Sequence, residues 1–348
     1  MCLALWGIRD RTAFHCVYGC EQSHMKSLLA WLFCAVAVGS AATAQTAQQG
    51  TAAHSRESSK AAELTVVLLG TGAGPPPNPR RSGPSTLIIA NSEYLLFDCG
   101  RGVSVQLARL QITPGLIRKV FITHLHSDHV IGLPDLYLTG WISANATPFR
   151  VWGPTGTRSM MAHIQKAFAY DIHVRRDVDE KLNKRAIELL TADIQPGVVY
   201  NKRGVKVTAF LVDHAPIEPA FGYRIDYAGH SVVLSGDTRF SENLIKHAQN
   251  VDVLIHEAVN PQAIRAHRPQ SQPPDRLEKI IAHHTSAEQA GMVFARSKPR
   301  LAVFSHINDD DLVTPARKNY SGPLETGEDL MTIVIGEKVA VRKFTTAQ

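Results

Sequence analysis

The chain has 348 residues, of which 44% are hydrophobic and 20% charged, a composition typical of a globular protein with a large core. Its formal net charge of +6 is small for this length. No long basic run concentrates that charge, so the composition weakly favours anionic substrates and disfavours nucleic acid as a partner.

The N-terminal segment predicts an export signal. Met25 and Lys26 give a positive start, and residues 28–39 are apolar but too short for a membrane span of ~20 residues. Small residues at positions 42–44 then form a cleavage site near Ala44. We expect residues 1–44 to be an N-terminal extension with a signal peptide, and the protein to be periplasmic or secreted with no span after cleavage. A buried helix is the alternative, and a start at Met25 would leave residues 1–24 untranslated.

The rest of the chain alternates strands with helices. Residues 45–62 are small and polar, which predicts a flexible linker, and residues 63–348 are expected to form a single domain. This alternation is typical of an α/β protein. Only Cys99 follows the cleavage site, so no internal disulfide is possible. The expected strands cover residues 64–69, 85–90, 94–97, 119–123, 149–152, 205–212, 222–227, 230–235, 252–255 and 301–304, and the expected helices cover 103–110 and 157–170.

Six of the ten expected strands are followed within two residues by a histidine or an aspartate. The densest group is His124, His126, Asp128 and His129, directly after a buried strand. Imidazole with carboxylate suits zinc, with manganese or iron as alternatives. A His-rich surface loop is the other interpretation, and the position of the group after a buried strand disfavours it.

The strand ends supply enough ligands for two metal ions. One ion would take three histidines, a second ion a carboxylate and two histidines, and a further carboxylate would bridge them, as in two-metal hydrolases. A bridging water would lose a proton near neutral pH and act as the nucleophile. The two ligand sets are His124, His126 and His214, and Asp128, His129 and His306, with Asp237 as the bridge.

Ten motifs in order resemble the metallo-β-lactamase superfamily, and within it the ribonuclease Z branch with its phosphodiesterase and arylsulfatase relatives. The resemblance implies an αββα sandwich of two mixed β-sheets flanked by helices. It also implies that Asp128, His284 and Glu257 are catalytic, with His284 as proton donor steered by Glu257, and that Asp98 orients a ligand histidine. His284 as part of a helix start is the alternative. The motifs are Leu69-Gly-Thr-Gly-Ala73, Phe97-Asp-Cys-Gly100, the His cluster with Ile131-Gly-Leu-Pro134, Gly153-Pro154, Asp213-His214, Phe221-Gly-Tyr-Arg-Ile225, Ser235-Gly-Asp-Thr238, His256-Glu-Ala258, His284-Thr285 and Ser305-His306.

The chain departs from the ribonuclease Z pattern in two ways. Arg101 stands where that branch typically has glutamate, and one hairpin between Arg224 and Gly236 leaves no room for a tRNA-binding arm. We therefore expect an exported hydrolase with two zinc ions that acts on the phosphodiester bond of a small anionic ester. The alternatives are an arylsulfatase, a ribonuclease Z-like tRNA 3′-processing endonuclease and a non-catalytic envelope metal binder. Members of the family are often dimers, which leaves a homodimer open.

Two further hypotheses concern the substrate. Arg80 and Arg81 follow a Pro-rich loop, where they would add positive charge beside the ester, although solvated loop arginines are the interpretation we favour. Trp141, Phe168 and Tyr170 are candidate pocket residues, with packing in the core as the alternative.

Overall fold

The computed structural model describes residues 63–143, 147–266, 273–308 and 310–345. The expected signal peptide and linker lie outside the described residues. Within these ranges no helix is long and apolar enough to cross a membrane.

Two mixed β-sheets form the centre of the described part of the chain. The first has the strand order β15-β14-β1-β2-β3-β4-β5-β6. Its strands are β1 (Leu64–Gly70), β2 (Ser85–Ala90), β3 (Glu93–Phe97), β4 (Lys119–Phe121), β5 (Phe149–Gly153), β6 (Leu189–Asp193), β14 (Met331–Ile335) and β15 (Val339–Arg342). Pairing is antiparallel from β15 to β3 and parallel from β3 to β6.

The second sheet has the order β13-β12-β11-β10-β9-β8-β7. Pairing is antiparallel from β7 to β10 and parallel from β10 to β13. Its strands are β7 (Gly197–Lys202), β8 (Val205–Val212), β9 (Ala220–Tyr227), β10 (His230–Leu234), β11 (Val253–His256), β12 (Leu301–Phe304) and β13 (Leu324–Thr326).

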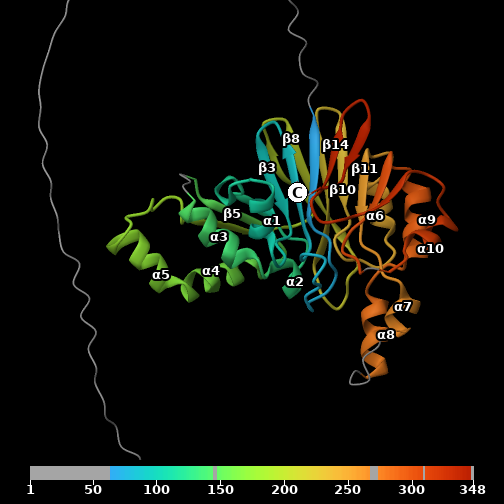
Figure 1. Cartoon of the computed structure of the whole chain (residues 1–348), viewed down its shortest axis with the longest axis horizontal. Coiled ribbons are helices and arrows are strands. Elements are labelled where there is room, and N and C mark those ends of the chain that lie inside the picture. Colours follow the sequence, from blue (N-terminus) through green and yellow to red (C-terminus); the bar gives the residue numbers. More distant parts are fainter. Residues whose placement is uncertain (1–62, 144–146, 267–272, 309, 346–348) are drawn as a thin grey trace, which may run out of the picture. The chain divides into compact units, whose positions relative to one another are not determined.

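Helices cover the outer faces of both sheets. Figure 1 shows α1, α3 and α4 on one side and α6, α9 and α10 on the other, which confirms the αββα sandwich. The helical elements are α1 (Val103–Arg109), the 3₁₀ turn η1 (Pro114–Leu116), α2 (Ser127–Val130), α3 (Leu133–Ile142), α4 (Thr157–Ala167), α5 (Ala169–His173), the π-helix η2 (Val174–Val178), α6 (Glu242–His247), α7 (Pro261–Ala266), α8 (Pro274–Ala282), α9 (Ala287–Ser297) and α10 (Val313–Arg317).

Strand β1 shows why the sequence forms these layers. Successive side chains of a strand point to opposite faces. Leu64, Val66 and Leu68 enter the core between the two sheets, whereas Val67 and Leu69 enter the core beneath α1 and α3. Because both faces are buried, the strand is a nearly continuous apolar run rather than an alternating one.

The carboxyl ends of six strands meet at one edge of the two sheets. The strands β3, β4, β8, β10, β11 and β12 each end one to three residues before a polar residue that the sequence analysis selected. Near this edge, the Tyr223 hydroxyl donates to the Ile122 carbonyl oxygen at 2.8 Å, and the Phe221 amide donates to the Thr123 carbonyl oxygen at 2.9 Å. Main-chain and side-chain bonds therefore tie the two sheets together beside the site.

Candidate metal centre

The His cluster begins as β4 ends and continues into the short helix α2. The strand is buried, and it ends at Phe121 rather than at the expected Thr123. His129 turns back through a hydrogen bond from its amide to the carbonyl oxygen of His126, 3.1 Å long. The extended segment and the single helical turn therefore present their ligands in two directions.

The first ligand group consists of three histidines from two sheets. The Nδ1 atom of His126 lies 3.0 Å from Nε2 of His124 and 3.1 Å from Nε2 of His214. Together with a carboxylate oxygen of Asp237, these atoms all lie within 4.8 Å of one another. The structure thus brings the predicted first set together.

The second ligand group lies beside the first. His306 Nε2 is 3.3 Å and His129 Nε2 is 3.6 Å from Oδ2 of Asp128. Asp237 faces both groups, because Oδ2 lies 3.7 Å from His124 Nε2 and 3.4 Å from His129 Nε2, and Oδ1 lies 3.5 Å from His306 Nδ1. Its carboxylate therefore holds the position predicted for the bridge.

The chemistry of these side chains fits metal ions. Buried polar atoms normally find hydrogen-bond partners, yet His129 Nε2, Asp237 Oδ1 and His306 Nδ1 are buried without one. Burial lowers the pKa of His124 well below its usual value and that of His214 to about 4, so both rings are the neutral form that binds metals. A cluster of imidazoles and carboxylates with open lone pairs suits zinc, manganese or iron.

Hydrogen bonds to the outer ring nitrogens fix which atoms face the centre. Asp98 Oδ2 lies 2.8 Å from His129 Nδ1, and its Oδ1 accepts the Thr123 amide at 2.8 Å. The Thr123 hydroxyl lies 3.0 Å from His124 Nδ1, and the His283 carbonyl oxygen lies 3.0 Å from His214 Nδ1. Asp98 thus lies where the resemblance implied. Sequence reasoning missed Thr123 and the His283 carbonyl, for which adjacency to a histidine was the only signal.

Two residues of the site have a left-handed backbone. Asp98 has φ 57° and His306 has φ 53°. Such conformations cost about 1–3 kcal/mol outside glycine and persist where the surroundings impose them. Both are here part of the ligand arrangement, so the fold holds these side chains in place against a local preference.

His284 and Glu257 form a buried pair beside the ligands. His284 Nδ1 lies 3.1 Å from Glu257 Oε1, which also accepts the amides of Thr238 and Thr285 at 3.1 Å each. Burial lowers the pKa of His284, but the charge and hydrogen bond of Glu257 outweigh it and raise the pKa to about 9. Glu257 therefore favours the protonated form of a ring that lies beside Asp237 and His306.

The helix start named in the alternative interpretation of His284 is present, but His284 lies two residues before its cap. Helix α9 begins at Ala287, and Ser286 caps it by accepting the Gln289 amide in a capping box. His284 lies before this cap, and its ring bonds Glu257 instead. The neighbouring His283 contributes its carbonyl oxygen to His214.

Two sequence hypotheses need correction. Trp141 is buried, and its indole nitrogen donates to the Asn183 carbonyl oxygen, so it belongs to the core rather than to a pocket. Tyr170 on α5 is 83% exposed, and Phe168 lies between α4 and α5.

Arg81 donates to the Thr71 hydroxyl and to the Gly327 carbonyl oxygen. These two hydrogen bonds anchor the loop that contains Arg81, so this residue is not a solvated loop arginine.

The αββα fold and the cluster of ligand side chains at the carboxyl ends of its strands define the protein as a metal-dependent hydrolase of the metallo-β-lactamase fold. The family model described as "Anti-Pycsar protein Apyc1" matches residues 64–284. A ribonuclease Z of Mycolicibacterium gilvum is 33% identical over 290 residues, which cover 80% of this chain and 99% of the relative. A ribonuclease Z of Mycobacterium avium is 33% identical over 78% of this chain and 98% of the relative.

Solved structures share the fold. The metallo-β-lactamase fold protein YhfI of Bacillus subtilis has a TM-score of 0.59 at 18% identity, covering 78% of this chain and 99% of that chain. The human short-form tRNase Z has a TM-score of 0.58 at 24% identity, covering 77% and 98%. The chain therefore belongs to the Apyc1 family, is a relative of ribonuclease Z and has the metallo-β-lactamase fold.

Proposed function

We propose that the protein hydrolyses phosphodiester bonds with the help of two metal ions, and that these ions are zinc. The observation that carries this proposal is the Asp237 carboxylate between two complete ligand groups. The first group would hold one ion and the second group the other. When bound, two such ions activate water and stabilise the charge that develops on the ester oxygens.

His284 supplies the proton that the leaving alcohol needs. Its Nδ1 is held by Glu257, so Nε2 is the atom that can donate to the leaving oxygen. Glu257 is itself fixed by two backbone amides, and its side chain is 1% exposed. Glu257 therefore fixes the orientation of the His284 ring.

Asp128 is ionised and anchored on the other side of the cluster. Burial raises its pKa, but the bond to His306 and the charge of His129 outweigh burial and lower the pKa to about 2. The residue also lines a small pocket. Asp128 thus combines a ligand position with contact to the space in which substrate would lie.

A large groove beside His284 favours a sizeable leaving group. Its volume is about 990 Å³, at the upper end of the roughly 300–1,000 Å³ of ligand pockets. His284 belongs to its lining, so the protonated alcohol would depart into this space. The other lining residues include Asp213, Arg239, Phe240, Asn260, Met292 and Lys318.

The test compares bis(p-nitrophenyl) phosphate with p-nitrophenyl sulfate as substrates of the zinc-loaded protein. We expect cleavage of the phosphate diester. Cleavage of the sulfate alone would contradict the proposal and favour the arylsulfatase alternative. Two bound metal ions without turnover of any ester would instead favour the non-catalytic metal binder.

tRNA processing is the second candidate, because the curated relatives are named ribonuclease Z. Strand β9 ends at Tyr227 and β10 begins at His230, so a two-residue turn occupies the place where the tRNA-binding arm would be inserted. This short connection supports a small substrate. Accurate 3′ cleavage of a precursor tRNA by the purified protein would overturn that preference.

We also propose that the protein is exported, on the basis of the N-terminal pattern alone. N-terminal sequencing of protein recovered from the periplasm or medium is expected to give a first residue at Gln45. A product that begins at Met1 or Met25 and stays in the cytoplasm would contradict export.

A further inference from the structure

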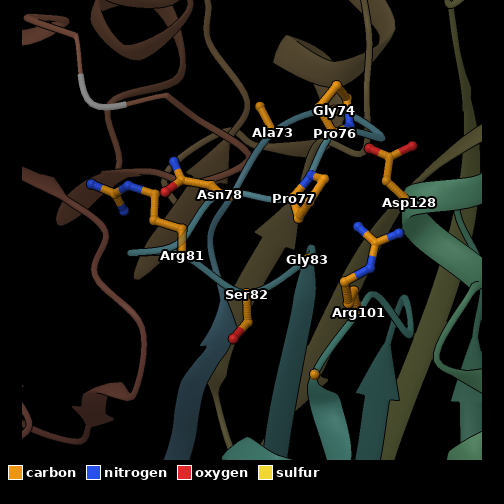
Figure 2. Close-up of a pocket in the computed structure, with 12 residues that line it drawn as sticks. Ala73, Gly74, Pro76, Pro77, Asn78, Arg81, Ser82, Gly83, Arg101 and Asp128 are labelled. Carbon is orange, nitrogen blue, oxygen red and sulfur yellow. The ribbon is translucent and has the colours of Figure 1, made fainter.

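A small pocket opens beside Asp128, apart from the groove at His284. Its volume is about 160 Å³, enough for a carboxylate- or phosphate-sized group. Figure 2 shows its wall of Pro76 and Pro77 opposite Asp128 and Arg101. No residue lines both this pocket and the groove at His284. The two cavities are therefore separate, one bordered by the candidate ligand Asp128 and the other by His284.

Arg101 is the cation of this pocket. Its side chain is exposed, and within the described residues its guanidinium donates one hydrogen bond, from Nη1 to the Pro75 carbonyl oxygen at 3.1 Å. Arg81 also borders the pocket, but its guanidinium bonds Thr71 and Gly327 and turns away from Arg101 (Figure 2). Several donors of the Arg101 guanidinium thus stay available to a ligand.

The main chain fixes Arg101 against the opposite loop. The Gly83 amide donates to the Arg101 carbonyl oxygen at 2.9 Å, and the Gly72 amide donates to the Ser82 carbonyl oxygen at 2.8 Å. A Cβ atom at Gly83 would lie 2.5 Å from the Arg101 nitrogen, so only glycine permits this approach. The two walls of the pocket are therefore held together by close backbone packing.

The charge of Asp128 does not prevent an anion from entering. Its Oδ2 faces Nε2 of His306 at 3.3 Å and Nε2 of His129 at 3.6 Å, so the carboxylate is directed into the second ligand group. Arg101 supplies positive charge on the same side of the pocket lining, facing Pro76 and Pro77. Guanidinium binds carboxylate and phosphate groups through paired hydrogen bonds.

We propose that this pocket binds a second anionic group on the part of the substrate that stays behind after cleavage, with Arg101 as its specificity-determining residue. The proposal rests on the proposed function for the direction of cleavage, because His284 assigns the leaving group to the other groove. The substrate class is then a phosphodiester whose retained part ends in a carboxylate or phosphate. A neutral retained part would leave Arg101 without its ligand.

The test measures binding by titration calorimetry with the zinc-loaded protein. The probes are 3-phosphonopropionate and 3-phosphonopropanamide, which share shape and phosphonate and differ in one charge. Arg101→Gln is expected to weaken binding of the carboxylate probe by on the order of tenfold, through loss of a charge-assisted hydrogen bond, and to leave the amide probe unaffected. Arg101→Lys is expected to bind the carboxylate probe with an affinity between those of the unmodified protein and Arg101→Gln, since lysine keeps the charge but loses the planar guanidinium.

Arg80→Gln is the matched control, because it removes the same charge from an exposed residue of the same loop that does not line the pocket. It is expected to bind both probes as the unmodified protein does. Equal weakening of both probes by Arg101→Gln would mean that Arg101 serves the phosphonate, and unchanged binding of both would mean a solvated arginine. Either result would overturn the proposal.

The binding comparison does not depend on turnover. If the unmodified protein fails to hydrolyse bis(p-nitrophenyl) phosphate, the proposed function fails while the two probes still decide the role of Arg101. If the protein hydrolyses the diester but binds both probes equally, only the second anionic group is excluded.

Discussion

Replacing Asp237 by alanine is expected to lower zinc affinity by more than roughly 100-fold and to remove phosphodiester hydrolysis. Loss of a partner that merely orients a ligand already costs about 10–100-fold in affinity, and Asp237 faces ligand atoms of both groups within 3.7 Å. Its removal would also leave several buried imidazoles without their shared carboxylate. Zinc retained after dialysis, counted by atomic emission, is the measurement.

Two further variants separate charge from shape. Asp237→Asn keeps the size of the side chain and is expected to lose nearly as much zinc, because an amide is a poor bridge between two cations. Asp226→Ala removes a carboxylate from the same sheet that pairs with Arg224 and Lys206, and it is expected to retain zinc. An Asp237→Ala protein that keeps two ions and full turnover would contradict the bridging role.

Replacing His284 by glutamine is expected to lower kcat by about 10²–10⁴ for a diester with an alkyl leaving group. An alkoxide is a poor leaving group, so it needs the proton that the Glu257-held ring supplies. The loss is expected to be much smaller with a p-nitrophenyl leaving group, which departs readily without protonation. The measurement is kcat for two diesters that differ only in the leaving alcohol.

His283→Gln is the neighbouring control, because the backbone carbonyl that orients His214 remains. It is expected to leave both rates close to those of the unmodified protein. His284, Asp237 and His306 also offer donor atoms within 4.8 Å of one another, so metal content must be counted alongside. Equal loss with both leaving groups, accompanied by loss of zinc, would make His284 a ligand instead of a proton donor.

The sequence predicted which side chains the structure brings together, because their signal is local. Each follows an apolar strand, and the ends of parallel strands meet at one edge of a sheet. Position along the chain was therefore enough to predict that His214, Asp237 and His306 lie together. The buried inner strands were predictable for the same reason, since β1 and β12 are apolar runs. Boundaries were less certain, as the end of β4 at Phe121 shows.

Features that depend on distant pairing escaped prediction. Strands β14 and β15 complete the first sheet beside β1. There Leu64 pairs with Ile335, although the two residues lie near opposite ends of the domain's sequence. Nothing local to residues 331–342 indicates that partner. Arg101 likewise drew attention only as a departure from a motif, and its contact with a pocket depends on the loop from Gly72 to Gly83 folding over it.

The most direct test of this account counts zinc ions per chain and measures turnover of bis(p-nitrophenyl) phosphate in the same sample of protein. Two ligand groups joined by Asp237 predict two ions per chain and hydrolysis that disappears when they are removed and returns when they are restored. A single ion at saturation, or two ions with no cleavage of the diester, would contradict the account.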